Sequence, residues 1–393
     1  MSRQMNFELP PSPTRHPIVG ALGMALFFLS MFPVGETYAK ATSVQPAMPL
    51  FISGEHGYNT FRIPAIARTT NDTLLAFAEG RVDGAADHGD VDLVMRRSTD
   101  NGATWSDLRV IRDDGENQAG NPCPLVDQRS GRVFLFFCSS SHSEGQVLSG
   151  TGSRDVCMMT SGDDGQSWTQ PSNISAMTKK PEWRWYATGP CSAIQIQTGK
   201  YAGRLVLPVN HSVHYSDGRR WEYRCHSIVS DDQGETWQIG ESSDPGGSET
   251  QIAEVGPDRL IQDIRMQTHR KGYRAVRFSN DGGLHWSDLT HDRLRPCPKC
   301  QGTIIAIPGE SPQLNRLVSA NPKGPGRSHL TVYESRDGGE RWEAMTLITE
   351  APAAYSDLVG IAKNEIGCLY ETGHKSPYER IDFQRFDIAV DTE

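Results

Sequence analysis

Ser98-Thr-Asp100-Asn-Gly102-Ala-Thr104-Trp105 is the stretch that decides the fold, because four looser copies of it follow in the chain. The pattern is Ser-x-Asp-x-Gly-x-Thr-Trp, and the further copies occupy 161–168, 230–237, 279–286 and 335–342. Five of the eight tryptophans therefore hold one position in a repeating unit. The serine-to-serine spacings of 63, 69, 49 and 56 residues describe a supersecondary block with variable loops. A period of about 50 residues in a β-rich chain is typical of propeller blades, so the sequence predicts an all-β propeller.

Each copy of this box follows a run of residues that reads as a β-strand, such as Leu93-Val-Met-Arg-Arg97. Asp, Asn and Gly in the box accept the turn conformations that close a hairpin. The tryptophan can then pack back over that hairpin as a large apolar anchor. An EF-hand calcium loop needs a different spacing of carboxylates, which none of the boxes supplies. We therefore expect the boxes to be structural.

Composition favours one large domain, which we place at residues 46–393. No linker-like stretch interrupts the sequence after residue 50, and a repetitive β architecture can reach this length without splitting. The net charge of −9 argues against nucleic acid or an anionic membrane surface as the main partner.

The N-terminal segment has the features of a secretory signal peptide, predicted at residues 1–41. Arg15 and His16 precede an apolar run over 18–32, and Ala39-Lys-Ala41 supplies a site with small residues for cleavage. The run is short for a membrane span, although a retained anchor remains the alternative. The sequence thus predicts a secreted, periplasmic or cell-surface protein.

The eight cysteines could form disulfides in an exported protein, but the sequence does not give their pairing. Cys297-Pro-Lys-Cys300 has no second pair at zinc-ribbon spacing, so we interpret it as structural. His211 and His214 lack a third ligand. We expect neither a metal nor another cofactor.

Five motifs outside the boxes together resemble the sialidase (neuraminidase) family of six-bladed propellers, over roughly residues 47–390. They are Tyr58-Asn-Thr-Phe-Arg-Ile-Pro64, Ala76-Phe-Ala-Glu-Gly-Arg81, Asp87-His-Gly-Asp-Val-Asp92, Tyr355-Ser-Asp-Leu358 and Cys368-Leu-Tyr-Glu371. The boxes alone are a weak functional signal, whereas Phe-Arg-Ile-Pro with Tyr-Ser-Asp-Leu and Leu-Tyr-Glu in this order is a strong one. The resemblance implies a six-bladed β-propeller that acts on sialic acid.

The resemblance also implies which residues bind the sugar. Arg62, Arg274 and Arg327 match the three arginines that grip the sialic acid carboxylate. A guanidinium stays charged and offers a planar fork of donors, which suits a carboxylate. Glu371 matches the carboxylate that braces the first arginine, and Arg81 matches the arginine near the ring substituents.

The position of the second arginine is less constrained by the sequence than the other two. Arg265, Arg270, Arg274 and Arg277 crowd together there, and Gly-Tyr-Arg favours Arg274.

The same resemblance assigns the chemistry. Tyr355 matches the nucleophile, Glu254 in Ala-Glu-Val matches the glutamate that polarises it, and Asp87 matches the acid/base. A neutral phenol avoids the repulsion that a second carboxylate would meet at an anionic sugar, but it needs a base beside it. Asp83 and Asp90 remain alternatives for the acid/base, because the preceding loop varies in length across the family.

Three aromatic residues, Trp183, Trp185 and Tyr186, are candidates to line an apolar pocket for the N-acetyl group. The leading function is an exo-α-sialidase that releases terminal sialic acid from glycoconjugates with retention of configuration. The alternatives are a trans-sialidase, an anhydro-forming enzyme, or a catalytically silent propeller that binds sialic acid.

Overall fold

The computed structural model describes residues 43–215, 221–268 and 272–388, all of which belong to one compact unit of the chain. The predicted signal peptide, residues 1–41, lies outside these ranges. Within them, no helix is long and apolar enough to cross a membrane. The helices found there, α1 (Glu144–Ser149) and α2 (Ser175–Thr178), are short, and the remaining regular elements are strands.

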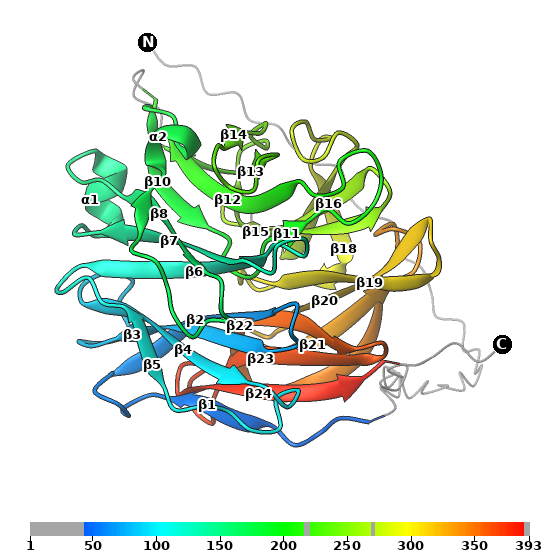
Figure 1. Cartoon of the computed structure of the whole chain (residues 1–393), viewed down its shortest axis with the longest axis horizontal. Helices are drawn as coiled ribbons and strands as arrows, with labels where there is room; N and C mark the ends of the chain where they lie inside the picture. Colours follow the sequence, from blue (N-terminus) through cyan, green and yellow to red (C-terminus); the bar gives the residue numbers. More distant parts are fainter. Residues whose placement is uncertain (1–42, 216–220, 269–271, 389–393) are drawn as a thin grey trace, which may run out of the picture. The chain divides into compact units, whose positions relative to one another are not determined.

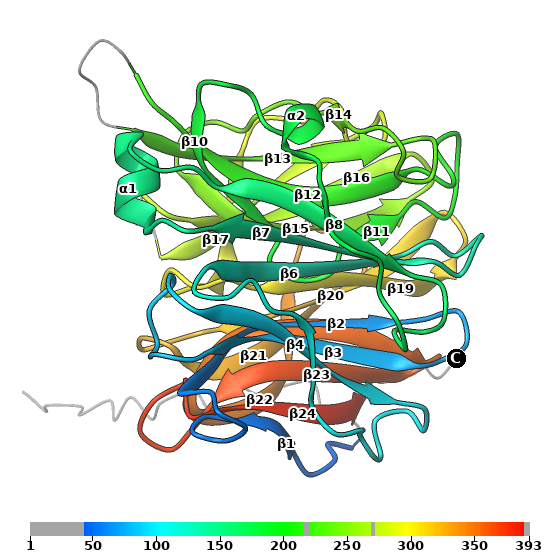
Figure 2. The same cartoon turned by 60° about the vertical axis from the view of Figure 1, so that its left-hand side comes forward.

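The first three blades are built from consecutive antiparallel strands (Figures 1 and 2). Blade 1 contains β2 (Thr60–Arg68), β3 (Leu74–Arg81), β4 (Val91–Ser98) and β5 (Arg109–Arg112). Blade 2 contains β6 (Gln118–Val126), β7 (Val133–Ser140), β8 (Asp155–Ser161) and β9 (Ser172–Asn173). Blade 3 contains β10 (Trp183–Thr188), β12 (Leu205–Val213), β13 (Glu222–Ser230) and β14 (Gln238–Ile239), with β11 (Ile194–Gln195) beside β12.

The last three blades repeat this arrangement. Blade 4 contains β15 (Gly247–Gly256), β16 (Arg259–Met266), β17 (Tyr273–Ser279) and β18 (Thr290–Pro296). Blade 5 contains β19 (Thr303–Ser311), β20 (Leu314–Pro322), β21 (Ser328–Ser335) and the first part of β22 (Glu343–Ala362). Blade 6 contains the rest of β22 with β23 (Glu365–Thr372), β24 (Arg380–Asp387) and β1 (Met48–Ile52).

Hydrogen bonding joins these strands into four sheets, because two sheets each hold two blades. Strand β22 continues from blade 5 into blade 6, and one parallel pair, Val91 with Gln118, connects blades 1 and 2. The described strands therefore form six blades, which confirms the predicted fold class.

Strand β1 closes the ring of blades. It pairs with β24 from Met48 opposite Phe383 to Ile52 opposite Arg380, so the first described strand becomes the outer strand of the last blade. Figure 1 shows β1 in blue along β24 in red. Because β1 covers the outer edge of β24, the first described strand ties the start of the chain's described part to its last blade.

Each box is a hydrogen-bonded loop with the same internal geometry. In the first copy, Ser98 Oγ accepts from the Gly102 N–H at 2.8 Å, and Asp100 accepts from the Thr104 N–H at 2.9 Å. The Thr104 hydroxyl also donates to Asp100 and is the largest cause that lowers the pKa of the Asp100 carboxyl to about 2, followed by the Thr104 N–H. The same serine and aspartate contacts recur in the other four copies.

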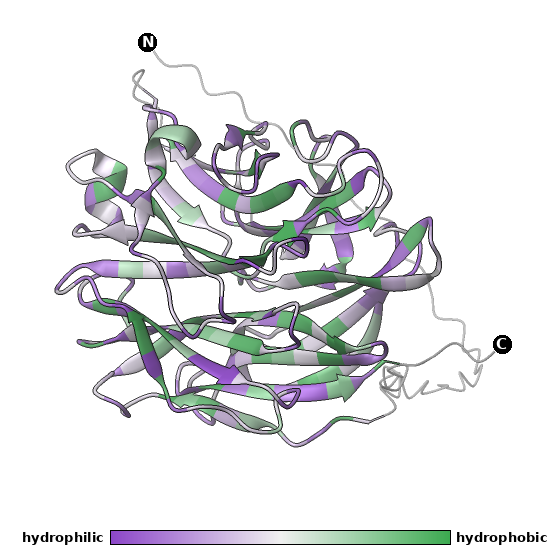
Figure 3. Cartoon of the chain, in the orientation of Figure 1, coloured by the Kyte–Doolittle hydropathy of each residue, from purple (hydrophilic) through white to green (hydrophobic). Residues whose placement is uncertain are grey.

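The tryptophans of the boxes pack between blades, whereas the sequence predicted packing over their own hairpins. Trp105 of blade 1 lies edge-on to Phe383 of blade 6, with ring centroids 5.1 Å apart. Trp237 of blade 3 meets Phe136 of blade 2 in the same way, also at 5.1 Å. Each box thus joins its blade to the preceding one. Figure 3 shows hydrophobic positions interspersed with polar ones along these strands, as expected where opposite faces have different neighbours.

Candidate functional site

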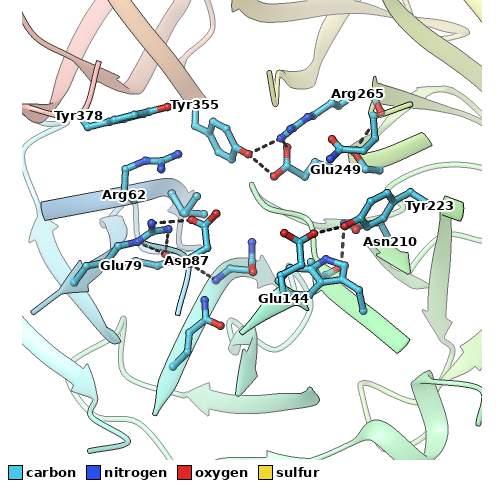
Figure 4. A pocket seen from close by; sticks show the side chains of 18 of the residues that line it. Arg62, Glu79, Asp87, Glu144, Asn210, Tyr223, Glu249, Arg265, Tyr355 and Tyr378 are labelled. Carbon is cyan, nitrogen blue, oxygen red and sulfur yellow. Dashed lines mark hydrogen bonds and ion pairs between the residues drawn. The ribbon is translucent and has the colours of Figure 1, made fainter. Parts of the chain in front are cut away.

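The innermost strand of each blade begins at one end of the propeller axis, and a pocket of about 340 Å³ opens there. The pairing of five of these strands shifts in register at this end, within 62–65, 120–123, 183–186, 247–250 and 353–356. A β-bulge of this kind re-aims a side chain. Each of the five segments supplies a residue to the pocket wall: Arg62, Asn121, Trp185, Glu249 and Tyr355. Figure 4 shows Arg62, Glu249 and Tyr355 pointing into this pocket.

Tyr355 lies at the centre of the polar contacts in this pocket. Its hydroxyl donates to Glu249 and accepts from Arg265 Nη1 at 2.6 Å, and Arg265 also pairs with Glu249. Burial is the largest cause that raises the pKa of Tyr355, and Glu249 raises it further, while Arg265 and Arg327 oppose the shift. The phenol is therefore protonated at neutral pH, with a carboxylate in place to receive its proton.

The prediction that Glu254 polarises Tyr355 is wrong, because the partner is Glu249. Glu254 instead accepts from the backbone N–H groups of Gln197 and Thr198, at 2.7 and 2.9 Å. It lies five residues further along β15, which at the rise of a strand is roughly 16 Å from the pocket end. Glu254 lines a separate cavity. Glu249, like Arg62, lies near the start of the innermost strand of its blade. This position could have identified Glu249 as the correct residue.

Three arginines surround the ring and hydroxyl of Tyr355. The guanidinium carbons of Arg62 and Arg327 each lie 5.3 Å from its ring centroid, on the wall of the same pocket. The third is Arg265, which donates to its hydroxyl. Positive charge is thus concentrated on one side of the pocket.

Arg274, predicted as the second arginine of this group, is not in the pocket. It is fully buried, pairs with Asp263 at 2.7 Å and donates to the Cys300 carbonyl at 3.0 Å. Arg274 does not reach the pocket because its strand, β17, lies one strand further from the propeller axis than β16, which carries Arg265. Arg277 is bonded to Gln262 within the blades, and Arg270 lies outside the described residues.

Glu371 connects two of these groups beneath the pocket. One of its oxygens accepts from Arg62 Nε at 2.6 Å and from the Ile63 N–H at 2.9 Å. The other accepts from the Tyr355 N–H at 3.1 Å. The carboxylate therefore holds Arg62 and the backbone of Tyr355 in a fixed relation.

Asp87 reaches the opposite side of the pocket on the loop that follows β3. Its carboxylate lies 2.7 Å from Arg81 Nη1, and Arg81 is itself paired with Glu79 at 2.5 Å. Desolvation raises the pKa of Asp87, but Arg81 and Arg62 outweigh it and lower the pKa below its usual value. Asp83 and Asp90 do not line the pocket.

Only one of the three predicted aromatic residues, Trp185, lines the pocket. Its ring carries the buried guanidinium of Arg154, 4.3 Å from the ring centroid. Trp183 and Tyr186 belong to the core between blades 2 and 3. The sequence analysis also missed Glu144 and Tyr223, which are hydrogen-bonded to each other on this side of the pocket.

The cysteines form no disulfide: all eight are free and buried. Cys297 and Cys300 pack with Ile63, Ala354 and Tyr355 in a small apolar cluster. Across the described ranges, no group of three or more His, Cys, Asp or Glu residues is arranged to hold a metal ion.

Comparisons with known proteins show which family the chain resembles. The BNR repeat-like domain family matches residues 72–368. A sialidase of Micromonospora viridifaciens is 30% identical over 94% of this chain and 58% of its own length. An exo-alpha-sialidase of Arthroderma benhamiae is 30% identical over 90% of each chain.

Among solved structures, the Hadza microbial sialidase Hz136 has a TM-score of 0.78 and 26% identity, covering 88% of this chain and 69% of its own. The chain spans only about three fifths of the length of the first two curated relatives, at 58% and 61%. The match to the Arthroderma protein, by contrast, extends over nearly the whole of both chains. The chain therefore belongs to the sialidase family.

Proposed function

We propose that this protein is an exo-α-sialidase, a glycoside hydrolase that releases terminal sialic acid from sialylated glycoproteins, glycolipids or oligosaccharides. The observation that carries the proposal is the hydrogen-bonded pair of Tyr355 and Glu249, with three arginines beside it in one pocket. A site that only binds an anionic sugar could use the arginines, but it has no need of a phenol whose proton faces a carboxylate.

The arginines Arg62, Arg265 and Arg327 would bind the carboxylate on the anomeric carbon of the sugar. Each guanidinium stays charged at any working pH and can donate two parallel hydrogen bonds. Binding there would place the anomeric carbon close to Tyr355, because Arg265 touches the Tyr355 hydroxyl and the other two lie against its ring.

Tyr355 would attack the anomeric carbon as its proton passes to Glu249, which gives a covalent glycosyl–tyrosine intermediate. Asp87 would protonate the leaving glycosidic oxygen and then activate water for the second step. Two inversions retain the α configuration. Because Arg81 lowers the pKa of Asp87, we expect turnover of substrates with poor leaving groups to fall as pH rises above the acidic range.

The test is release of the fluorophore from an aryl α-sialoside by the wild-type protein and by Tyr355→Phe. We expect turnover by the wild type and a loss of at least about 10³-fold in the variant. Tyr370→Phe is the matched control, because Tyr370 is a buried, hydrogen-bonded tyrosine in blade 6 away from the pocket. No turnover by the wild type would contradict the proposal. NMR of the product would separate free sialic acid from a new sialoside or an anhydro sugar.

The proposal includes export of the protein. The charged flank, apolar run and small-residue site in residues 1–41 support cleavage before a catalytic domain at 46–393. N-terminal sequencing of protein recovered from outside the producing cell should begin close to residue 42. Recovery of the intact N-terminus would favour a retained anchor.

A further inference from the structure

The backbone of β22 leaves its regular pairing where it presents Tyr355 to the pocket. The register shifts between Ala353 and Ser356, so backbone groups there need partners other than a neighbouring strand. Two side chains supply them: Glu371 accepts from the Tyr355 N–H at 3.1 Å, and Gln301 accepts from the Ser356 N–H at 3.0 Å.

Gln301 binds the backbone of Ser356, the residue after Tyr355, with both ends of its side-chain amide. Its Oε1 accepts from the Ser356 N–H, and its Nε2 donates to the Ser356 carbonyl at 2.9 Å. The residue is 1% exposed and lies two positions before β19, in blade 5. The contact therefore crosses from one blade to the next.

Together, Glu371 and Gln301 fix the two peptide units on either side of the Tyr355 Cα atom. These two units determine φ and ψ of Tyr355, and so the direction in which its side chain leaves the strand. The hydroxyl at the far end of that side chain must meet Glu249 and Arg265, which belong to blade 4. A small rotation of the backbone would displace the hydroxyl, and a misplacement of about 1 Å can cost 10²-fold in rate.

We propose that Gln301 is a positioning residue for Tyr355, an inference that rests on the proposed sialidase function. It does not line the pocket, so it acts on catalysis through the backbone of Ser356, whose N–H belongs to the peptide that follows Tyr355. Its carboxamide suits the task, because one planar group offers an acceptor to the N–H and a donor to the C=O of one residue. A carboxylate keeps the acceptor and loses the donor, and a thioether loses both.

A purely structural role would make a different prediction. Leaving buried N–H and C=O groups unpaired destabilises a protein, but the folded fraction then works at the normal rate. A positioning role requires kcat to fall in fully folded protein while ground-state binding is kept. The loss should also be similar for activated and natural sialosides, because it affects the attack by Tyr355 and not the departure of the leaving group.

The test compares Gln301→Met and Gln301→Glu with the wild type, in protein confirmed as folded by circular dichroism. For Gln301→Met we expect kcat to fall about 10- to 100-fold. The dissociation constant for free sialic acid should stay within about twofold. Gln301→Glu should lie between Gln301→Met and the wild type.

Gln195→Met is the matched control. Gln195 is also buried and bonds a backbone N–H and a backbone carbonyl, those of Gln128 and Gly203, but it lies away from the pocket. We expect it to lose stability and keep kcat.

Wild-type turnover with unchanged kcat in both Gln301 variants would overturn this inference alone, and an equal loss of kcat in Gln195→Met would do the same. Failure of both Gln301 variants to fold would assign the residue to the fold and overturn it too. An inactive wild type would overturn the proposed function and this inference together.

Discussion

In the proposed mechanism, Tyr355 of blade 6 would obtain its reactivity from two side chains of blade 4. Burial alone makes the phenol harder to ionise, since it raises the pKa of Tyr355. Arg265, on β16 of blade 4, donates to the phenol oxygen and would stabilise negative charge as it develops. Glu249, on β15 of the same blade, accepts the hydrogen bond of the phenol and would take its proton. Attack by the phenol would thus be favoured only where all three side chains are held together.

The two glutamates of β15 provide a matched test at the residue scale. Glu249→Gln removes the proton acceptor of Tyr355 and should lower kcat about 10²- to 10⁴-fold, the usual contribution of a positioned general base. Glu254→Gln makes the same chemical change roughly 16 Å away on the same strand and should keep kcat. Steady-state kinetics with an aryl α-sialoside would measure both. Equal kinetics in the two variants would remove Glu249 from the proposed mechanism.

Whether the sequence could identify a pocket residue depended on where that residue lies along its strand and on where the strand lies within its blade. Arg62 and Tyr355 were both singled out from the sequence, and both line the pocket, because their motifs include the β-bulges that turn these side chains towards it. The motifs Ala-Glu-Val and Gly-Tyr-Arg contain no bulge at the pocket end of an innermost strand. A motif of three residues does not show how far along its strand a residue lies. It also does not show how many strands separate that strand from the propeller axis. This is why Glu254 and Arg274 were assigned wrongly.

The boxes were predictable because each is a local hydrogen-bonded loop whose pattern is repeated. They account for five blades, and the sixth has no box because β1 supplies its outer strand. The pairing of β1 with β24 joins residues more than 300 positions apart, as in Met48 opposite Phe383. It could therefore not be predicted from any local sequence pattern.

Gly102 provides a test at the scale of one box. Its φ of +82° is in the left-handed region, and a Cβ atom added there would lie 2.2 Å from Cε1 of Phe383 in blade 6. Gly102→Ala should therefore lower the free energy of unfolding by about 2–5 kcal/mol, from backbone strain and overpacking together.

The control for this variant is Gly115→Ala. Gly115 has a φ of +64° and no atom within 4 Å of an added Cβ, so it should show only the backbone part, about 1–2 kcal/mol. Chemical denaturation would measure both, and kcat of the folded protein should not change. Equal losses would mean that the contact between blades at Phe383 adds nothing to the strain.

On the scale of the whole molecule, the blades are joined at the axis as well as at their edges. The buried carboxylate of Asp357 in blade 6 accepts from the Ile66 N–H in blade 1 at 2.9 Å and from the Ser192 N–H in blade 3 at 3.0 Å. It also accepts from Thr303 in blade 5 at 3.1 Å and from Gln251 in blade 4 at 3.3 Å. With β1 closing the ring, a change within one blade should be felt in the stability of the whole.

Because the blades are connected in this way, we expect a buried histidine pair in blade 3 to make the free energy of unfolding of the whole domain depend on pH. His211 and His226 are both fully buried, and their Nδ1 atoms lie 3.0 Å apart, so at most one proton can occupy the space between them. Burial is the largest cause that lowers the pKa of both well below the ordinary value. Nearby Lys180 and Arg277 lower both further.

The sign of the effect follows from these shifts. Below about pH 6.5 the unfolded chain takes up protons on both histidines, whereas the folded chain does not. The stability is therefore fully present above pH 6.5 and is lost as pH falls, by up to about 1.4 kcal/mol per pH unit for each histidine. Burial raises the pKa of Asp357 to about 7, so this carboxyl takes up a proton more readily in the folded chain than in the unfolded chain. Its contribution to the free energy of unfolding therefore grows as pH falls, opposite to that of the histidines. A comparison between variants is needed to isolate the histidines.

We expect His226→Gln to have a shallower loss of stability than the wild type between pH 6.5 and pH 5, by about 1.4 kcal/mol per pH unit, because one of the two protons is no longer taken up on unfolding. Urea denaturation at pH 7, 6 and 5 would measure this difference. His374→Gln, at an exposed position, is the control and should follow the wild type. Parallel curves for His226→Gln and the wild type would mean that His226 is already protonated in the folded protein over this pH range.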